Sequence, residues 1–189
     1  MKFEQLEIVG LPKSFRIYKA VDYLYPEGKE LTPEEVIYDE YPAECDEDKG
    51  EDASVVFKYN ESTTGVYILH SRPAQLFTLC LSPWAVEADV LLYAGIINAV
   101  LKKHPRAKLY DKYAPLKEIT TDDVERMISD RKKYLKKMLT TKNEFTMEGI
   151  NHDFTLCPEH LRPASSIDMQ VFELQRMFAK MQWDNFEEE

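Results

Sequence analysis

The order of strand-like and helix-like segments along the chain limits its fold more than any other feature. Three short runs rich in β-branched and aromatic residues, at 54–59, 66–70 and 75–81, follow one another and are separated by turn-forming residues. A long apolar run at 86–101 and two amphipathic helical patterns come after them. Strands that precede helices, without β-α-β alternation, predict an α+β protein with an antiparallel or mixed sheet covered by helices.

Shorter signals complete this prediction. Strand-like runs at 3–9 and 14–24 open the chain, and a short run at 107–110 and a hairpin at 144–147 and 153–156 follow later. We expect about five to seven of these runs to form the sheet. Residues that favour helix N-caps mark the starts of three main helices. These starts are Ser82, which opens a helix to about Lys103, then Thr120 or Thr121, and finally Ser165 or Ser166, which opens a C-terminal amphipathic helix at about 166–184.

Length and composition predict a single domain over residues 1–189. Hydrophobic residues make up 44% of the chain and aromatic residues 12%, which is sufficient for one sizeable core. Cys45, Cys80 and Cys157 are irregularly spaced, and the first ten residues are charged and lack an apolar signal core. These features favour a reduced, cytoplasmic setting.

The long apolar run is predicted to be a core helix and not a membrane span. It is shorter than the roughly 20 residues that a span needs, and it contains Glu87, Asp89 and Asn98. We interpret Glu87 and Asp89 as acids near a positive helix N-terminus with access to solvent at one edge, in preference to a general acid or base. No membrane partner is therefore expected.

The clearest functional feature is the acidic segment, residues 27–52. The chain has 34 acidic and 24 basic residues; twelve of the acids and two of the bases lie in this segment, which leaves 22 of each elsewhere. The whole net charge of −10 is thus concentrated there. A local block of like charge attracts cationic partners.

Recognition of a basic protein is the interpretation we prefer, because tyrosines accompany the acids and are enriched at protein interfaces. The predicted partner-binding residues are Tyr38, Glu40, Tyr41, Glu44, Asp46, Glu47, Asp48, Glu51 and Asp52. One concrete form is an inhibitor or immunity protein that covers the cationic active site of a nuclease-like toxin. Nucleic acid is not expected, since the same field opposes the approach of phosphate.

Three other interpretations of the acidic segment stay open: a solvated loop, a site for a hard cation, and docking on the chain's own bases at 131–142. A calcium loop counted from Asp46 has Gly50 at its fifth position and Phe57 at its twelfth, where the template needs glycine at the sixth and glutamate at the twelfth. We therefore predict no metal and no cofactor. Residues 131–142 carry six bases and no acid, but exposed ion pairs are weak and screened by salt.

Only one stretch, 152–160, resembles an enzyme site. Cys157 and His160 have C-x-x-H spacing and His152 lies upstream, so the three could bind zinc or form a cysteine–histidine dyad. A structural cysteine with surface histidines is the preferred interpretation, because no fourth ligand is evident. A small hydrolase or zinc-dependent enzyme centred on Cys157, His160 and His152 remains the alternative function.

The C-terminal helix carries more apolar residues than one buried stripe requires. Ile167, Val171, Leu174, Phe178 and Met181 form that stripe. Additional methionine and aromatic residues are typical of adaptable partner surfaces. A structural or assembly subunit that forms a homo-oligomer through this helix is the third hypothesis.

Overall fold

The computed structural model confirms the α+β class. It describes residues 4–24, 37–40, 50–58, 60–112, 114–141, 143–157 and 166–183, and for 37–40 it describes the backbone alone. In chain order the elements are β1 (Glu4–Val9), α1 (Ile17–Asp22), β2 (Ile37–Glu40), β3 (Glu51–Phe57), β4 (Val66–Ser71), β5 (Leu76–Leu81), α2 (Glu87–Lys103), β6 (Lys108–Asp111), β7 (Ala114–Leu116), α3 (Thr121–Thr141), β8 (Phe145–Met147), β9 (Phe154–Leu156) and α4 (Ile167–Trp183).

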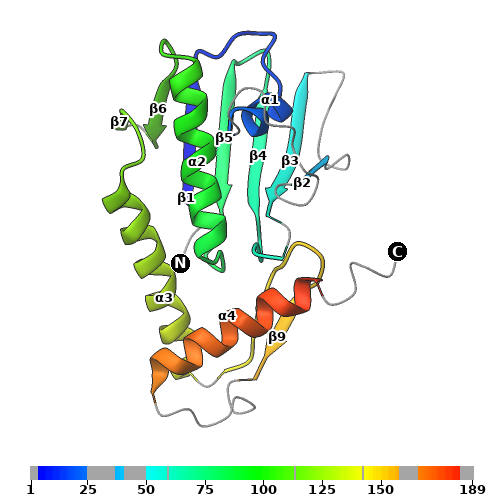
Figure 1. Ribbon diagram of the computed structural model, residues 1–189, viewed down its shortest axis with the longest axis vertical. Coiled ribbons are helices and arrows are strands. Elements are labelled where there is room, and N and C mark those ends of the chain that lie inside the picture. Colours follow the sequence, from blue (N-terminus) through cyan, green and yellow to red (C-terminus); the bar gives the residue numbers. More distant parts are fainter. Residues whose placement is uncertain are drawn as a thin grey trace.

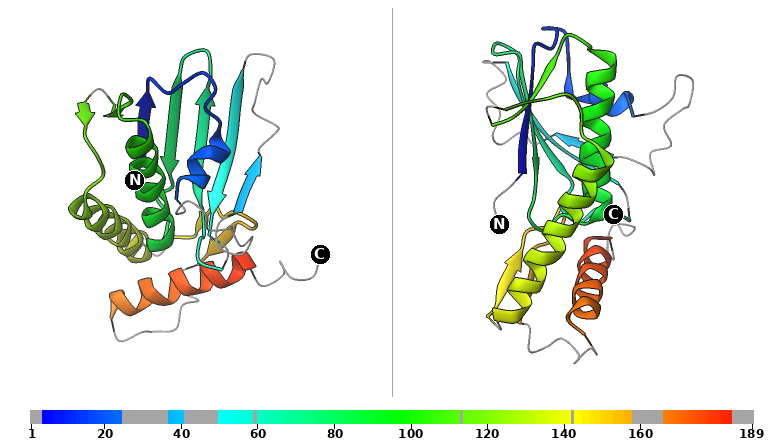
Figure 2. Two further views of the ribbon diagram at one scale, coloured as in Figure 1. Left: turned by 45° about the horizontal axis from the view of Figure 1, so that its top comes forward. Right: turned by 90° about the vertical axis from the view of Figure 1, so that its left-hand side faces the viewer.

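Seven strands form one antiparallel sheet in the order β2-β3-β4-β5-β1-β6-β7. Helices α1 and α2 lie on one face of this sheet, and α3 runs from its β6–β7 side toward α4 (Figure 1). The pair β8–β9 is a separate two-stranded sheet beside α4. Among the described elements, no helix packs on the opposite face of the large sheet, which we call the outer face (Figure 2).

Alternation of buried and more exposed side chains along β1 and β4 contributes to the main core. In β1, Leu6 and Ile8 are buried toward the helices, whereas Gln5 is exposed on the outer face. In α2, the most apolar helix, Tyr93 and Ile96 are fully buried against the sheet. The core therefore lies between the sheet and the two helices α1 and α2.

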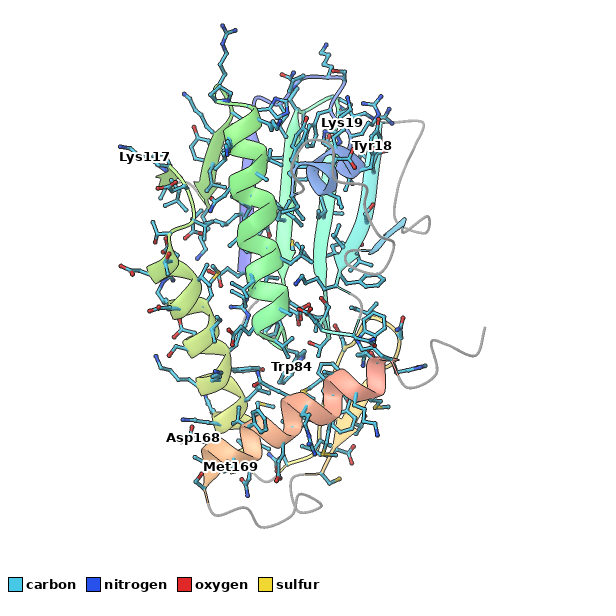
Figure 3. All side chains as sticks on the ribbon, in the orientation of Figure 1. Tyr18, Lys19, Trp84, Lys117, Asp168 and Met169 are labelled. Carbon is cyan, nitrogen blue, oxygen red and sulfur yellow. The ribbon has the colours of Figure 1, made fainter. Side chains whose placement is uncertain are left out.

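A second apolar cluster lies between α3, the β8–β9 hairpin and α4. Trp84, in the segment between β5 and α2, packs against this cluster. Its ring lies 5.0 Å from that of Tyr134 in α3 and 5.7 Å from that of Phe145 in β8, near the place where α2, α3 and α4 approach one another (Figure 3). Trp183, at the end of α4, donates a hydrogen bond of 3.0 Å from Nε1 to the carbonyl of Ser62. These two tryptophans connect α4 and its hairpin to the large sheet.

Helix α3 is attached to the sheet through a buried cation. Arg131 is 1% exposed. Its Nε donates to the carbonyl of Ser82 at 3.1 Å, and its Nη1 donates to Oε2 of Glu4 at 3.2 Å and to the carbonyl of Met127 at 3.1 Å. The basic run 131–142 is therefore not uniformly exposed to solvent, because Arg131, its first residue, is buried.

Three expectations about elements were wrong. The run 14–24 contains helix α1, because Ile17, Ala20 and Val21 are buried at helical spacing. Helix α2 begins at Glu87 and not at Ser82, since the residues after Ser82 form a turn in which its hydroxyl accepts from Trp84 N–H at 3.1 Å. Asp89 is completely buried, so it has no access to solvent.

Most other expectations are confirmed. The three-strand meander is β3, β4 and β5, the predicted hairpin is β8–β9, and α3 and α4 begin close to the predicted caps. Within the described part of the chain, no helix combines the length and the apolar character that a membrane crossing requires.

Candidate functional site

The acidic segment meets the fold at one edge of the large sheet. Its described parts are β2, which is the edge strand, and the start of β3. In the register, Tyr38 pairs with Val56 and Glu40 with Ser54, so two predicted partner-binding residues have a place on this edge. The predicted residues that lie outside the described part are Tyr41, Glu44, Asp46, Glu47 and Asp48.

The two acids at the start of β3 differ in environment. Glu51 is exposed on the outer face. Asp52 points to the helix-covered face, where Oδ1 lies 3.5 Å from Arg72 Nη2 and Oδ2 lies 3.6 Å from His70 Nδ1. Part of the charge of Asp52 is thus neutralised within the molecule, and Glu51 is the better placed of the two for an external cation.

His70 is the buried partner of Asp52, and sequence reasoning did not single it out. Its ring packs edge-on against Phe15 and Phe77, and it is 2% exposed. Burial lowers the pKa of His70, and the nearby carboxylate of Asp52 opposes this shift. The buried hydroxyl of Ser54 lies on the same face of β3, and neither it nor His70 Nδ1 has a hydrogen-bond partner. Asp52 and His70 are among the residues that line a small hollow of about 230 Å³ at this end of the sheet.

The structure does not bring His152 and Cys157 together as a dyad. His152 is exposed before β9 and Cys157 follows it, so the strand separates them. Cys157 Sγ lies 3.2 Å from Oε2 of Glu144, to which it donates a hydrogen bond. His160 lies outside the described residues. Within the residues that the structure describes, no three histidine, cysteine or acidic side chains are grouped to hold a metal ion.

The outer face of the sheet carries a hollow that sequence reasoning missed. Its volume is about 590 Å³. We call it the outer-face hollow, and its lining residues are Gln5, Val55, Thr64, Gly65, Tyr67, Leu69, Cys80, Ser82, Glu148, Gly149 and Ile150. Strands β1, β3, β4 and β5 supply the floor, and the β8–β9 connection supplies one wall. These segments are distant in the sequence, and no local motif relates them.

Asp89 organises the turn that forms another part of this wall. Its carboxylate Oδ2 accepts from the backbone N–H groups of Thr63 at 3.2 Å and Thr64 at 3.3 Å, and Oδ1 accepts from Gly65 N–H at 3.1 Å. The threonine hydroxyls also donate to Oδ2. Oδ2 further accepts from Val86 N–H at 3.1 Å, which caps α2. One buried carboxylate therefore fixes both the helix start and the turn.

Gly65 is required in that turn by its backbone and its surroundings. Its φ of +63° is in the left-handed region, where side chains other than that of glycine are strained. A Cβ atom here would also lie 2.9 Å from the carbonyl oxygen of Val56. The wall at Thr64 and Gly65 is consequently rigid and closely packed on the sheet.

The β8–β9 connection is held by a buried amide. Gln182 Oε1 accepts from the N–H groups of Asn151 at 2.9 Å and His152 at 3.1 Å, and its Nε2 donates to the His152 carbonyl at 2.8 Å. A Cβ atom on Gly149 would overlap this amide, so glycine permits the close approach. Ile150 N–H also donates to the Thr63 carbonyl at 2.9 Å, which joins this wall to the turn held by Asp89.

Cys80 contributes an uncharged thiol to the floor of the hollow. Burial raises the pKa of Cys80, and the negative charge of Glu7 adds to the increase. A thiol with a raised pKa is a poor nucleophile at neutral pH. Cys80 therefore contributes a neutral thiol to the largely apolar floor of the hollow.

A second hollow of about 610 Å³ lies between α3 and α4. Its floor includes Ile128 and Phe172, and Phe172 is 61% exposed. Lys136 pairs with Asp168, which lies at the start of α4 (Figure 3). Lysines and carboxylates occur together around this hollow, so it presents no single sign of charge to a partner.

Comparison of the chain with protein-family models, with curated protein sequences and with solved structures found no match.

Proposed function

We propose that the protein is a non-enzymatic binding protein whose acidic segment engages a basic protein partner. The observation that supports this most is the distribution of charge: residues 27–52 hold the whole net charge of −10, while the rest of the chain is balanced. This field attracts a cationic partner and accelerates its encounter. An inhibitor or immunity protein that covers a cationic active site is the specific form that we propose.

The fold supports an outward role for part of the segment. Strand β2 lies at the edge of the sheet, and Glu51 is exposed at the start of β3. Asp52 is the exception, since its Oδ1 already pairs with Arg72 at 3.5 Å and its Oδ2 faces the buried ring of His70 at 3.6 Å. We therefore assign the external contacts to the acidic segment without Asp52.

Capture of a partner from the source cells at low and at moderate salt tests the proposal. The test variant neutralises the centre of the segment with Glu44→Gln, Asp46→Asn, Glu47→Gln and Asp48→Asn. The control neutralises four exposed acids elsewhere with Glu118→Gln, Asp122→Asn, Glu125→Gln and Asp153→Asn. At about 0.5 kcal/mol for each exposed charge, the test variant should bind about 30-fold more weakly, and the control should bind like the wild type.

Two outcomes would contradict this proposal. One is that no basic protein is retained at low salt. The other is that a retained protein is indifferent to the test variant, or responds equally to the control, because a general loss of negative charge would then explain the result.

Self-association through α4 is a second candidate. Met169, Phe172 and Met177 are 47%, 61% and 44% exposed, and Met169 lies near the start of the helix (Figure 3). Exposed methionine and aromatic side chains are typical of adaptable interfaces. Measurement of the molecular mass in solution tests this: a Phe172→Ser variant should dissociate a dimer, and a wild-type protein that is monomeric at all concentrations removes this candidate.

A further inference from the structure

The outer-face hollow has a chemical character that agrees with a basic ligand. Its floor is largely apolar, with Val55, Leu69 and Cys80 from three neighbouring strands. Among the described residues that line it, the one charged side chain is that of Glu148, which is exposed on the wall. An apolar floor with a carboxylate at the rim fits a long side chain that has an aliphatic stem and a cationic end.

The surrounding charge has the same sign. Glu7 lies on the outer face of β1 beside Gln5, whose Nε2 donates to Oε1 of Glu7 at 3.3 Å. The negative charge of Glu7 extends to the floor, as its effect on the thiol of Cys80 shows. None of the described residues that line the hollow is basic. An anionic ligand would therefore be repelled, and a cationic ligand would be attracted.

The hollow is continuous with the acidic edge of the sheet. Val55, which lines the hollow, pairs in the β2–β3 register with Asp39 of the acidic segment. A partner held at β2 thus lies one strand away from the floor formed by β3 and β4. One extended segment of a partner can contact both places.

We propose that the outer-face hollow binds an arginine or lysine side chain, with part of its backbone, from the basic partner. This inference rests on the proposed function and adds the residues that would determine specificity. The stem of the side chain packs on Leu69, Val55 and Cys80, and its cationic end lies at the Glu148 carboxylate. Tyr67 supplies an aromatic ring among the lining residues, and aromatic faces attract cations. A volume of about 590 Å³ is within the range of small-ligand sites.

Titration with a defined probe, followed by NMR of the amide groups, tests the inference without the natural partner. The probe is N-acetyl-arginine methylamide, and the matched probes are the norleucine and glutamate derivatives. The arginine probe should give saturable shifts at residues that line the hollow, above all Leu69, Cys80 and Ile150. The norleucine probe should bind more weakly, and the glutamate probe should not bind.

Two variants and a matched control locate the effect. Glu148→Gln removes the rim charge at an exposed position and should weaken binding of the arginine probe about 2- to 5-fold. Leu69→Lys introduces a cation on the floor and should abolish saturable shifts. Leu91→Lys makes the same substitution at a leucine of α2 that is 53% exposed, compared with 40% for Leu69, and should bind like the wild type. The amide spectrum of each variant reports whether the fold is intact, and Glu148→Gln decides the question if Leu69→Lys is misfolded.

The inference is overturned if the arginine and norleucine probes bind equally, if the shifts occur outside the hollow, or if Glu148→Gln has no effect. Its failure is distinct from failure of the proposed function. If only the inference about the hollow fails, neutralisation of the acidic segment still releases the basic partner, but the arginine probe does not bind in the hollow. In the opposite case, the probe occupies the hollow but neutralisation of the segment leaves partner capture unchanged.

Discussion

Replacement of Asp89 should destabilise the protein more than replacement of any other described acid, and this prediction tests how the hollow is built. The carboxylate accepts hydrogen bonds from four backbone N–H groups, those of Thr63, Thr64, Gly65 and Val86, and from two threonine hydroxyls. Asp89 is also 0% exposed. Asp89→Ala removes the acceptor of these four N–H groups and two hydroxyls at a buried position.

The expected magnitude follows from these contacts. An unsatisfied buried donor costs about 1–3 kcal/mol. The hydroxyl of Thr64 has the Gly65 carbonyl as another acceptor, at 3.4 Å, and water entering the cavity can serve some of the N–H groups. We therefore expect a loss of about 3–5 kcal/mol in the free energy of unfolding for Asp89→Ala. Asp89→Asn keeps the shape of the side chain, but its amide N–H groups would face other hydrogen-bond donors. It should therefore lower the free energy of unfolding by about 2–4 kcal/mol.

Urea unfolding followed by fluorescence and circular dichroism measures both variants. Glu87→Gln is the matched control, because Glu87 is in the first turn of the same helix but is exposed; its loss should cost no more than about 1 kcal/mol. If Asp89→Ala costs as little as this control, the carboxylate does not hold the turn and our account of the wall at Thr64 and Gly65 is wrong. A native amide spectrum for Asp89→Ala, with unshifted signals at those two residues, would contradict it in the same way.

Two further predictions concern the buried Arg131 and two histidines, His70 and His104. Arg131→Lys removes the guanidinium group that donates hydrogen bonds to Glu4 and to two backbone carbonyls, so the free energy of unfolding in urea should fall by about 2–4 kcal/mol. The control Arg126→Lys, at an exposed position, should change it by less than about 0.5 kcal/mol. Equal effects of the two substitutions would refute the anchoring role of Arg131. Burial lowers the pKa of His70 and of His104 below 6.5, so the unfolded state takes up protons first as the pH falls. Stability should be full above pH about 6.5 and decrease below it, by at most about 1.4 kcal/mol per pH unit for each histidine; NMR titration that finds both midpoints above 6.5 would contradict this.

Hydrophobic periodicity predicted the elements with long or strictly alternating patterns. It failed at 14–24 because Ile17, Tyr18 and Val21 have high β propensity. The helical spacing of Ile17, Ala20 and Val21 became meaningful only with the burial of these three residues in the main core. The start of α2 was misplaced because Ser82 and Pro83 have the composition of a helix start. A local cap signal could not show that a carboxylate seven residues beyond Ser82 caps the helix and also binds a distant turn.

The candidate sites differ in how far sequence can reveal them. A charge block is a property of composition, so a count of acidic and basic residues along the chain is enough to reveal the acidic segment. The outer-face hollow combines Gln5, Tyr67, Cys80 and Glu148, which share a surface only because β1 is placed between β5 and β6 and the β8–β9 hairpin closes below the sheet. Register assigns the direction of each strand side chain, and that register is set by tertiary packing.

Charge and shape would contribute to partner recognition in different ways. The field of the acidic segment would act over about 10 Å at moderate ionic strength. It would raise the rate of encounter with a basic partner, and this effect would be lost as the salt concentration increases. The hollow would act only on contact, through apolar burial on Leu69 and Val55 and through the carboxylate of Glu148. In the proposed complex it would slow dissociation and discriminate among basic partners. Because Asp39 pairs with Val55, the acidic segment and the outer-face hollow are adjacent. A cation attracted by the acidic segment would then reach the hollow, where none of the described lining residues is basic.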